Sequence, residues 1–160
     1  MELSAVALSI PEGCNLILGQ AHFIKTAEDL YEVMVTGAPG AKFGVAFSEA
    51  SGPCLVRAEG NDDALKASAI QNAMNVACGH VFCIVMRDCF PINVLNAVKA
   101  CPEVAGVFCA TANPAEVIVA QTASGRGVMG VVDGLPPKGV EGPDDVAERR
   151  GFLRKIGYKL

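Results

Sequence analysis

Polar and charged side chains follow the apolar segments of this sequence at most points where such a segment ends. Arginines and carboxylates recur among them, and together they suit a ligand that carries a phosphate and hydroxyl groups. In open α/β sheets ligands bind outside strand ends, so the set as a whole favours a functional site. Turns are polar in any case, which is the simpler interpretation for each residue alone. The residues are Ser48, Glu49, Ser51, Arg57, Glu59, Asn61, Asp62, Arg87, Asp88, Thr111, Asn113 and Asp133.

Residues 125–132, GRGVMGVV, contain the spacing G-x-G-x-x-G. In a dinucleotide-binding protein this spacing opens a helix, but here valines, a glycine and two prolines follow, which predict a strand and a turn. Roughly 35 residues remain downstream, too few for the catalytic parts of a protein kinase. Glycine lets backbone N–H groups approach an anion closely, and Arg126 adds a charge, so Gly125, Arg126 and Gly127 are candidates for binding phosphate. The alternative is a glycine-rich strand packed tightly against its neighbour.

Several catalytic motifs are absent. The sequence has no P-loop and no G-x-S-x-G nucleophile elbow, and His22 and His80 are isolated, as is typical of capping or core histidines. The seven cysteines are odd in number and include no C-x-x-C pair, which argues against a zinc site. Most of them lie in apolar runs, so we expect reduced, mostly buried thiols in a cytoplasmic protein.

Length and composition predict one domain over residues 1–160. The net charge is −4 and no basic run alternates with aromatic residues, which argues against a nucleic-acid partner. No apolar stretch reaches the ~18 residues of a membrane span, and the first residues lack the basic region of a signal peptide. Half of the residues are hydrophobic, an excess that predicts a homo-oligomer because obligate interfaces resemble a bisected core.

The apolar patterns predict an α/β fold with about four helices and a mixed β-sheet that contains hairpins at residues 42–58 and 115–132. We expect Thr26, Asn61 or Asp62, Pro91 and Pro143 to mark the helix starts. The expected helices are residues 26–35, 62–77, 91–100 and 143–156. The expected strands are residues 3–10, 15–24, 42–47, 54–58, 80–86, 104–111, 116–122 and 127–132.

Long segments over essentially the whole chain resemble the adenosine-specific kinases, a family of small archaeal and bacterial proteins. This resemblance implies a homo-oligomeric α/β protein, a trimer or hexamer, that binds adenosine or AMP and transfers a phosphoryl group to adenosine. Cys78 and Cys89 depart from the family pattern, in which small residues are expected, and neither change should affect the chemistry. The segments are GQAHFIKTAEDLYE, KFGVAFSEASG, LVRAEGND, CGHVFCIVMRDCFPINVLNAVK, ATANPAEVIVA, GRGVMGVVDG and FLRKIGYK.

The residues themselves suggest how such a kinase would work, with ATP or another nucleotide as donor and Mg²⁺ as cofactor. The 125–127 segment would hold phosphate and Arg57 would add a bidentate contact. Asp133 would be the general base or a Mg²⁺ ligand, and Asn61 or Asn113 would contact the adenine edge or the ribose. Two alternatives remain open: a non-catalytic oligomer that captures adenosine or AMP, and a nucleotide hydrolase.

Overall fold

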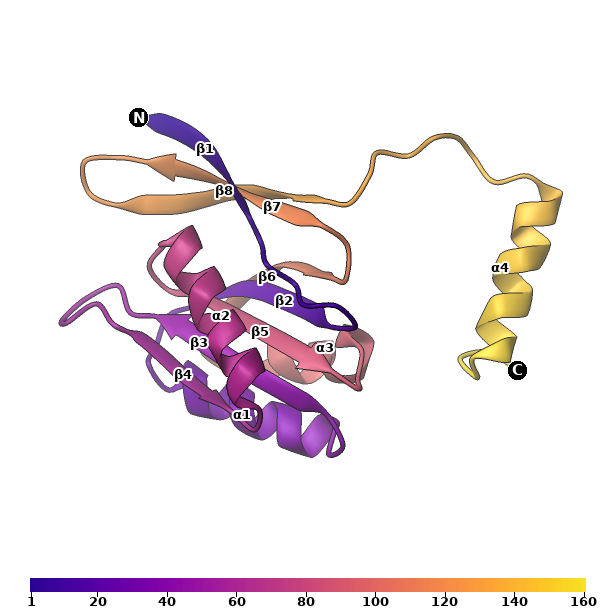
Figure 1. Cartoon of the computed structure of the whole chain (residues 1–160), viewed down its shortest axis with the longest axis horizontal. Helices are drawn as coiled ribbons and strands as arrows, with labels where there is room; N and C mark the ends of the chain where they lie inside the picture. Colours follow the sequence, from indigo (N-terminus) through magenta and orange to yellow (C-terminus); the bar gives the residue numbers. More distant parts are fainter.

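Hydrogen bonds divide eight strands into two sheets in the computed structural model, which describes all residues 1–160 (Figure 1). Every pair of neighbouring strands is antiparallel. The larger sheet has the order β4 (Val56–Gly60), β3 (Lys42–Ser48), β5 (Val81–Arg87), β2 (Asn15–Ala21), β6 (Val104–Thr111). The smaller sheet has the order β1 (Glu2–Ala7), β7 (Ala115–Gln121), β8 (Arg126–Asp133).

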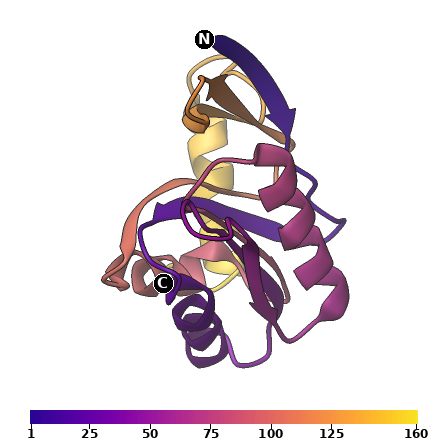
Figure 2. The same cartoon turned by 90° about the vertical axis from the view of Figure 1, so that its left-hand side faces the viewer.

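Three helices and the small sheet cover the two faces of the larger sheet (Figure 2). On one face, α1 (Thr26–Gly37) and α3 (Pro91–Ala100) bury a core that includes Leu30, Phe43 and Ile84. On the other face, α2 (Asp63–Val76) and the small sheet bury a second core around Leu65, Val85 and Val117. The larger sheet is therefore apolar on both faces, which explains the continuous apolar run of β5.

The predicted α/β architecture, the four helices and both hairpins are confirmed, and the structure resolves the mixed sheet into two antiparallel ones. Helix α1 joins β2 to β3, α2 joins β4 to β5, and α3 joins β5 to β6. Each crossover connects two strands that run the same way, but a third strand is inserted between them. No neighbouring strands are therefore parallel.

The helix starts follow the capping signals in three cases out of four. Asp62 caps α2 by accepting a hydrogen bond from the Leu65 backbone N–H at 3.0 Å, and prolines occupy the first positions of α3 and α4. The prediction that Thr26 caps α1 is wrong by one residue, because Lys25 is the cap. The buried Thr26 hydroxyl instead donates to the Phe23 carbonyl, which stabilises the turn before the helix.

The antiparallel order sends polar strand ends to two opposite ends of the molecule. One end, called the loop end, contains residues 21–25, 48–55, 77–80 and 122–125. The other, called the opposite end, contains residues 61–62, 87–88, 111–114 and 133–134. Strand β8 runs between them, and its first and last residues are roughly 23 Å apart at the usual rise per residue.

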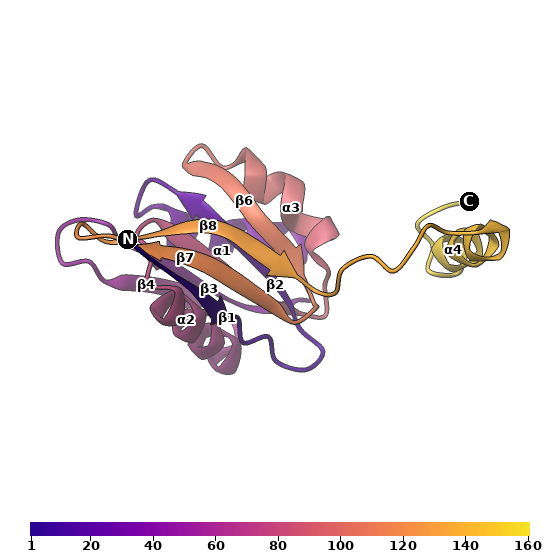
Figure 3. The ribbon, with the colours of Figure 1, turned by 90° about the horizontal axis from the view of Figure 1, so that it is seen from above.

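The last helix, α4 (Pro143–Lys155), lies away from the rest of the chain, here called the body (Figures 1 and 3). Residues 134–142, called the arm, connect it to β8 without a helix or strand. No residue of α4 is buried.

The cysteines follow the sequence prediction. All seven are free, four are buried and only Cys54 is exposed. Burial raises the pKa of the Cys109 thiol to about 11, and it raises the pKa of Cys83 further still, so these two thiols stay protonated and unreactive at neutral pH. None of the helices combines the length and the apolar character that crossing a bilayer requires.

Candidate functional site

The structure separates the seven residues that the sequence predicted as one site, so a single site made from all of them is not formed within this chain. The phosphate-binding candidates lie at the loop end, where β4 and β8 begin. The other three lie at the opposite end, where β4 and β8 finish and β7 starts. Sequence spacing could not show this, because it depends on the direction of each strand in the sheet. The loop-end residues are Arg57, Gly125, Arg126 and Gly127, and the others are Asn61, Asn113 and Asp133.

Asp133 lies in a hydrogen-bonded turn at the opposite end. The Thr111 hydroxyl donates to Asp133 Oδ1 at 2.6 Å, and the Asn113 amide donates to the same oxygen at 3.4 Å. The Gly134 N–H donates to the Pro114 carbonyl at 3.0 Å. Through these contacts, Asp133 and Asn113 join the β6–β7 connection to the end of β8.

Asn61 is likewise occupied by the backbone. Its amide donates to the Ala41 carbonyl at 2.9 Å, and its carbonyl oxygen accepts from the Phe43 N–H at 2.9 Å. Both polar groups of the side chain therefore join the end of β4 to the start of β3. The geometry favours a structural role for this residue.

The loop end contains two cavities, which lie on either side of residues 78–80. The first, called the His80 cavity, has a volume of about 310 Å³, and the second, called the Arg126 cavity, about 200 Å³. The His80 cavity is lined by His22, Phe23, Ile24, Phe47, Glu49, Ala50, Ser51, Gly52, Pro53 and His80. The Arg126 cavity is lined by Gln20, Cys78, Gly79, Val81, Phe108, Arg126, Gly127 and Val128.

His80 has an unusual and firmly held backbone. Its φ is 63°, in the left-handed region that few residues other than glycine adopt. The His80 N–H donates to the Ser48 carbonyl at 2.7 Å, and its carbonyl accepts from the Ala21 N–H at 2.9 Å. The imidazole stacks on Phe47 with ring centroids 5.9 Å apart and an interplanar angle of 13°. The ring is thus held at the cavity wall, and such strained positions cluster at functional sites.

Glu49 and Arg57 hold the loop that forms the other wall of the His80 cavity. Arg57 donates to Glu49 Oε1 from Nη2 at 2.8 Å and from Nε at 3.0 Å, while the Leu55 N–H donates to Oε2 at 2.8 Å. The Leu55 N–H and then the Arg57 guanidinium lower the pKa of Glu49. Glu49 is therefore an ionised hydrogen-bond acceptor and a poor proton acceptor, and Arg57 serves to position it.

Gly79 allows the two loops between the cavities to touch. A Cβ atom on this residue would lie 2.8 Å from the Ala50 side chain, closer than real Cβ contacts. The absence of a side chain thus lets residues 77–80 pack directly on residues 48–55. The contact joins Gly79, which lines the Arg126 cavity, to Ala50, which lines the His80 cavity.

Arg126 brings positive charge to the second cavity. It is half-buried and donates no hydrogen bond within the chain, so its guanidinium is available to an anion. Its charge acts on the neighbouring Cys78, although burial is the larger effect and raises the pKa of that thiol. Gly127 follows at the cavity wall, and Gly125 lines a hollow on the other side of the β7–β8 hairpin. Two residues of the predicted phosphate-binding segment, Arg126 and Gly127, therefore line the same cavity.

Sequence reasoning placed Glu49 and Ser51 of the His80 cavity in the strand-end set but missed its histidines and Phe23. Both histidines were interpreted as capping or core residues. Nothing in the sequence indicated that Phe23 lines a cavity, because in a short segment an exposed aromatic residue looks the same as a buried one. The available signal was the histidine that directly precedes the apolar β5 segment. Its left-handed backbone becomes visible only in the structure.

Comparisons with known proteins agree with one another. The family described as "Adenosine specific kinase" matches residues 6–159. The structure is similar to the crystal structure of the PH1918 protein from Pyrococcus horikoshii OT3, with a TM-score of 0.95, 45% sequence identity and coverage of 99% of this chain and 98% of that one. No curated protein matches the chain.

Proposed function

Because this chain belongs to the adenosine-specific kinase family, we propose that it binds adenosine at the loop end and transfers a phosphoryl group to the nucleoside 5′-hydroxyl. The observation that carries the proposal is that consecutive residues line the two cavities: Cys78 and Gly79 line the Arg126 cavity, and His80 lines the His80 cavity. One cavity suits a nucleoside and the other suits an anion. A nucleoside that is being phosphorylated needs the two side by side.

The His80 cavity has the size and chemistry for adenosine. Its volume of about 310 Å³ lies at the lower end of the range for ligand sites. Phe23 lines this cavity and is 53% exposed, so its ring is accessible to the adenine base. Stacking of a base on an aromatic side chain contributes on the order of 1–3 kcal/mol to binding. The ionised Glu49 carboxylate can accept hydrogen bonds from ribose hydroxyls.

The Arg126 cavity supplies charge for phosphate. A guanidinium binds phosphate oxygens with two parallel hydrogen bonds, and the absence of a side chain at Gly127 leaves the backbone beside it accessible. Because Arg57 is already paired with Glu49, we assign phosphate contact to Arg126 and a positioning role to Arg57.

In the proposed reaction the 5′-oxygen of adenosine attacks the terminal phosphorus of ATP, the bond to the bridging oxygen breaks, and ADP leaves. His80 accepts the proton released by the hydroxyl, and Arg126 stabilises the charge on the transferred group. No three His, Cys, Asp or Glu side chains are grouped closely enough to hold a metal ion by themselves. Mg²⁺ therefore fits this chain only as a complex with the donor phosphates, whose charge it would neutralise.

The test is to incubate the full chain with adenosine, ATP and Mg²⁺ and to quantify AMP and ADP by mass spectrometry. We expect AMP and ADP in equal amounts, and less AMP from guanosine or cytidine controls. Saturable binding of adenosine without AMP would support the alternative, a non-catalytic adenosine- or AMP-binding protein. Release of phosphate without AMP would indicate a nucleotide hydrolase.

A further inference from the structure

Helix α4 has no partner within its own chain. Isolated helices of about this length are marginal in water, and most helices in proteins are stabilised by packing an apolar face. Yet α4 is 13 residues long, contains Gly151 and buries no residue. Phe152 is 56% exposed and Ile156 43%. A surface outside this chain's own body is needed to cover it.

The faces of α4 define what that surface must offer. Val146, Leu153 and Ile156 recur at helical spacing and form an apolar stripe that is interrupted by Arg149, which pairs with Glu141. Arg150 and Arg154 lie four residues apart beside this stripe, and neither is in an ion pair. The complementary surface is therefore an apolar groove with an acidic rim.

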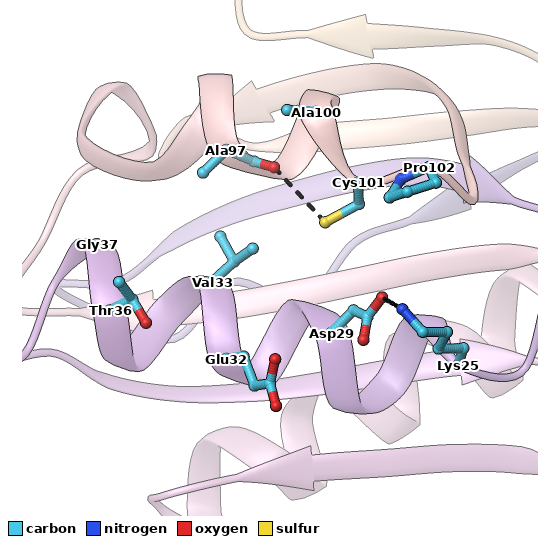
Figure 4. A pocket seen from close by; sticks show the side chains of 10 residues that line it. All are labelled: Lys25, Asp29, Glu32, Val33, Thr36, Gly37, Ala97, Ala100, Cys101 and Pro102. Carbon is cyan, nitrogen blue, oxygen red and sulfur yellow. Dashed lines mark hydrogen bonds and ion pairs between the residues drawn. The ribbon is translucent and has the colours of Figure 1, made fainter.

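The groove between α1 and α3 meets this description (Figure 4). It is the largest of the cavities described here, at about 490 Å³. Val33, Ala97 and Ala100 line it, and small side chains of this kind allow a third helix to approach closely. Asp29 and Glu32 form its acidic rim, where Lys25 pairs with Asp29 alone.

One oxygen of a buried carboxyl group beside the groove accepts no hydrogen bond. Glu103 directly follows Pro102, which lines the groove, and its side chain lies next to Asp29. It is 3% exposed, and its Oε1 atom accepts no hydrogen bond. Burial, and then the neighbouring Asp29, raise the pKa of this carboxyl group, which favours a protonated form that donates to the acidic rim.

We propose that α4 of one copy docks in the α1–α3 groove of a second copy. The apolar stripe covers Val33 and Ala97, and the Arg150 and Arg154 side chains face the acidic rim. The arm contains Pro136 and Pro137, which keep it extended, and it carries α4 beyond the opposite end of its own body (Figure 3). Because helix and groove are different surfaces, the contact is heterologous, and it closes as an exchanged pair or as a ring.

Two charge reversals in the full chain test this contact. Glu32→Arg alters the rim of the groove, and Arg154→Glu alters α4. Sedimentation equilibrium should show the wild type as a multiple of 16.6 kDa. Each variant alone should raise the dissociation constant by at least tenfold, and circular dichroism should show both still folded. Glu116→Lys, on the exposed face of β7, is the matched control and should leave the mass unchanged.

Mixing the two variants distinguishes a contact between copies from a contact within one chain. In the mixture, the unaltered α4 of one variant meets the unaltered groove of the other, and the two reversed charges attract each other, so the oligomer should re-form. A mixture that stays monomeric would overturn the proposal, as would a monomeric wild type or variants that keep the wild-type mass. Dissociation by Glu116→Lys instead would place the interface on the small sheet and would equally overturn it.

Discussion

His80 keeps its left-handed backbone through two main-chain hydrogen bonds, and neither bond needs an imidazole ring. Asparagine adopts this conformation readily, so His80→Asn removes the ring and preserves the loop. We expect AMP formation to fall by roughly 10²-fold or more, the usual contribution of a positioned base. The melting temperature should change by only a few degrees. Asp88→Asn, at a left-handed position of the opposite end, is the control, and full activity in His80→Asn would contradict the proposed role.

Arg126 should distinguish AMP from adenosine. A charged hydrogen bond contributes about 1.5–3 kcal/mol, but only where the ligand carries the phosphate. Arg126→Ala should therefore weaken AMP binding by roughly tenfold or more in calorimetric titration and leave adenosine nearly unchanged. Arg87→Ala is the matched control, since Arg87 pairs with Asp62 at the opposite end. Equal losses for both ligands would show that Arg126 is structural.

Asp133→Asn separates a base or metal ligand from a residue that holds its turn. Asparagine keeps the oxygen that accepts from Thr111 at 2.6 Å, so the turn should survive with little loss of stability. Because the geometry favours the turn role, we expect AMP formation to stay within a few-fold of the wild type. Asp133→Ala, which removes that acceptor, should cost roughly 1–3 kcal/mol in chemical denaturation. A fall in turnover of roughly 10²-fold in Asp133→Asn would restore the assignment of Asp133 as catalytic.

Glu103 should make stability depend on pH. Burial, and then the neighbouring Asp29, raise its pKa above the usual range, so the folded chain binds this proton more tightly than the unfolded chain does. The stabilisation is complete below the unfolded pKa of about 4.3 and is lost as the pH rises through the folded pKa. Melting temperatures across this window should fall for the wild type relative to Glu103→Gln. Parallel curves would contradict the shift, and Glu116→Gln serves as the exposed control.

At the level of residues, the sequence predicted which residues lie at strand ends better than which of them lie together. Arg126 and Gly127, from the segment predicted to bind phosphate, line a cavity at the loop end. Asn61, Asn113 and Asp133 were selected because they follow strands, and they do lie at strand ends. Their side chains are taken up by backbone and turn contacts that depend on tertiary structure. Polarity after a strand does not tell a ligand contact from a turn contact.

Strand β3 and helix α2 depend on a glycine for their close approach. A Cβ atom on Gly44 would lie 2.3 Å from the Lys66 backbone, so the helix would have to move. We expect Gly44→Ala to lower the free energy of unfolding by roughly 1–3 kcal/mol in urea denaturation. Gly151→Ala, in the open space around α4, should leave stability unchanged or raise it slightly. A neutral Gly44→Ala would show that α2 is free to shift.

Element bounds were predictable where local signals are strong. The predicted strand at 104–111 and the predicted helix at 91–100 match β6 and α3 residue for residue. Both hairpins were visible because their turns are local. The strand order was not, since the insertion of β5 between β2 and β3 is decided by packing between segments far apart in the sequence.

At the scale of the whole molecule, the body and α4 pose separate problems of stability. The body buries two cores on the faces of one sheet, whereas α4 adds no residue to either. The homo-oligomer predicted from the apolar composition remains a prediction. The proposed docking of α4 on a second copy specifies which surfaces would form its interface. If α4 is held by a second copy, its helical structure depends on protein concentration, as in any assembly in which folding and association are linked.

Strand β1 implies an order of events during synthesis. Its partner is β7, in a register that joins Glu2 to Gln121, so the first strand to leave the ribosome waits for one of the last. The larger sheet needs only residues 15–111 and can form earlier. Closing a loop of this length is entropically costly and slow, which leaves β1 without a partner while the chain is still growing. An unpaired strand edge of this kind is a potential site of aggregation while the chain is still incomplete.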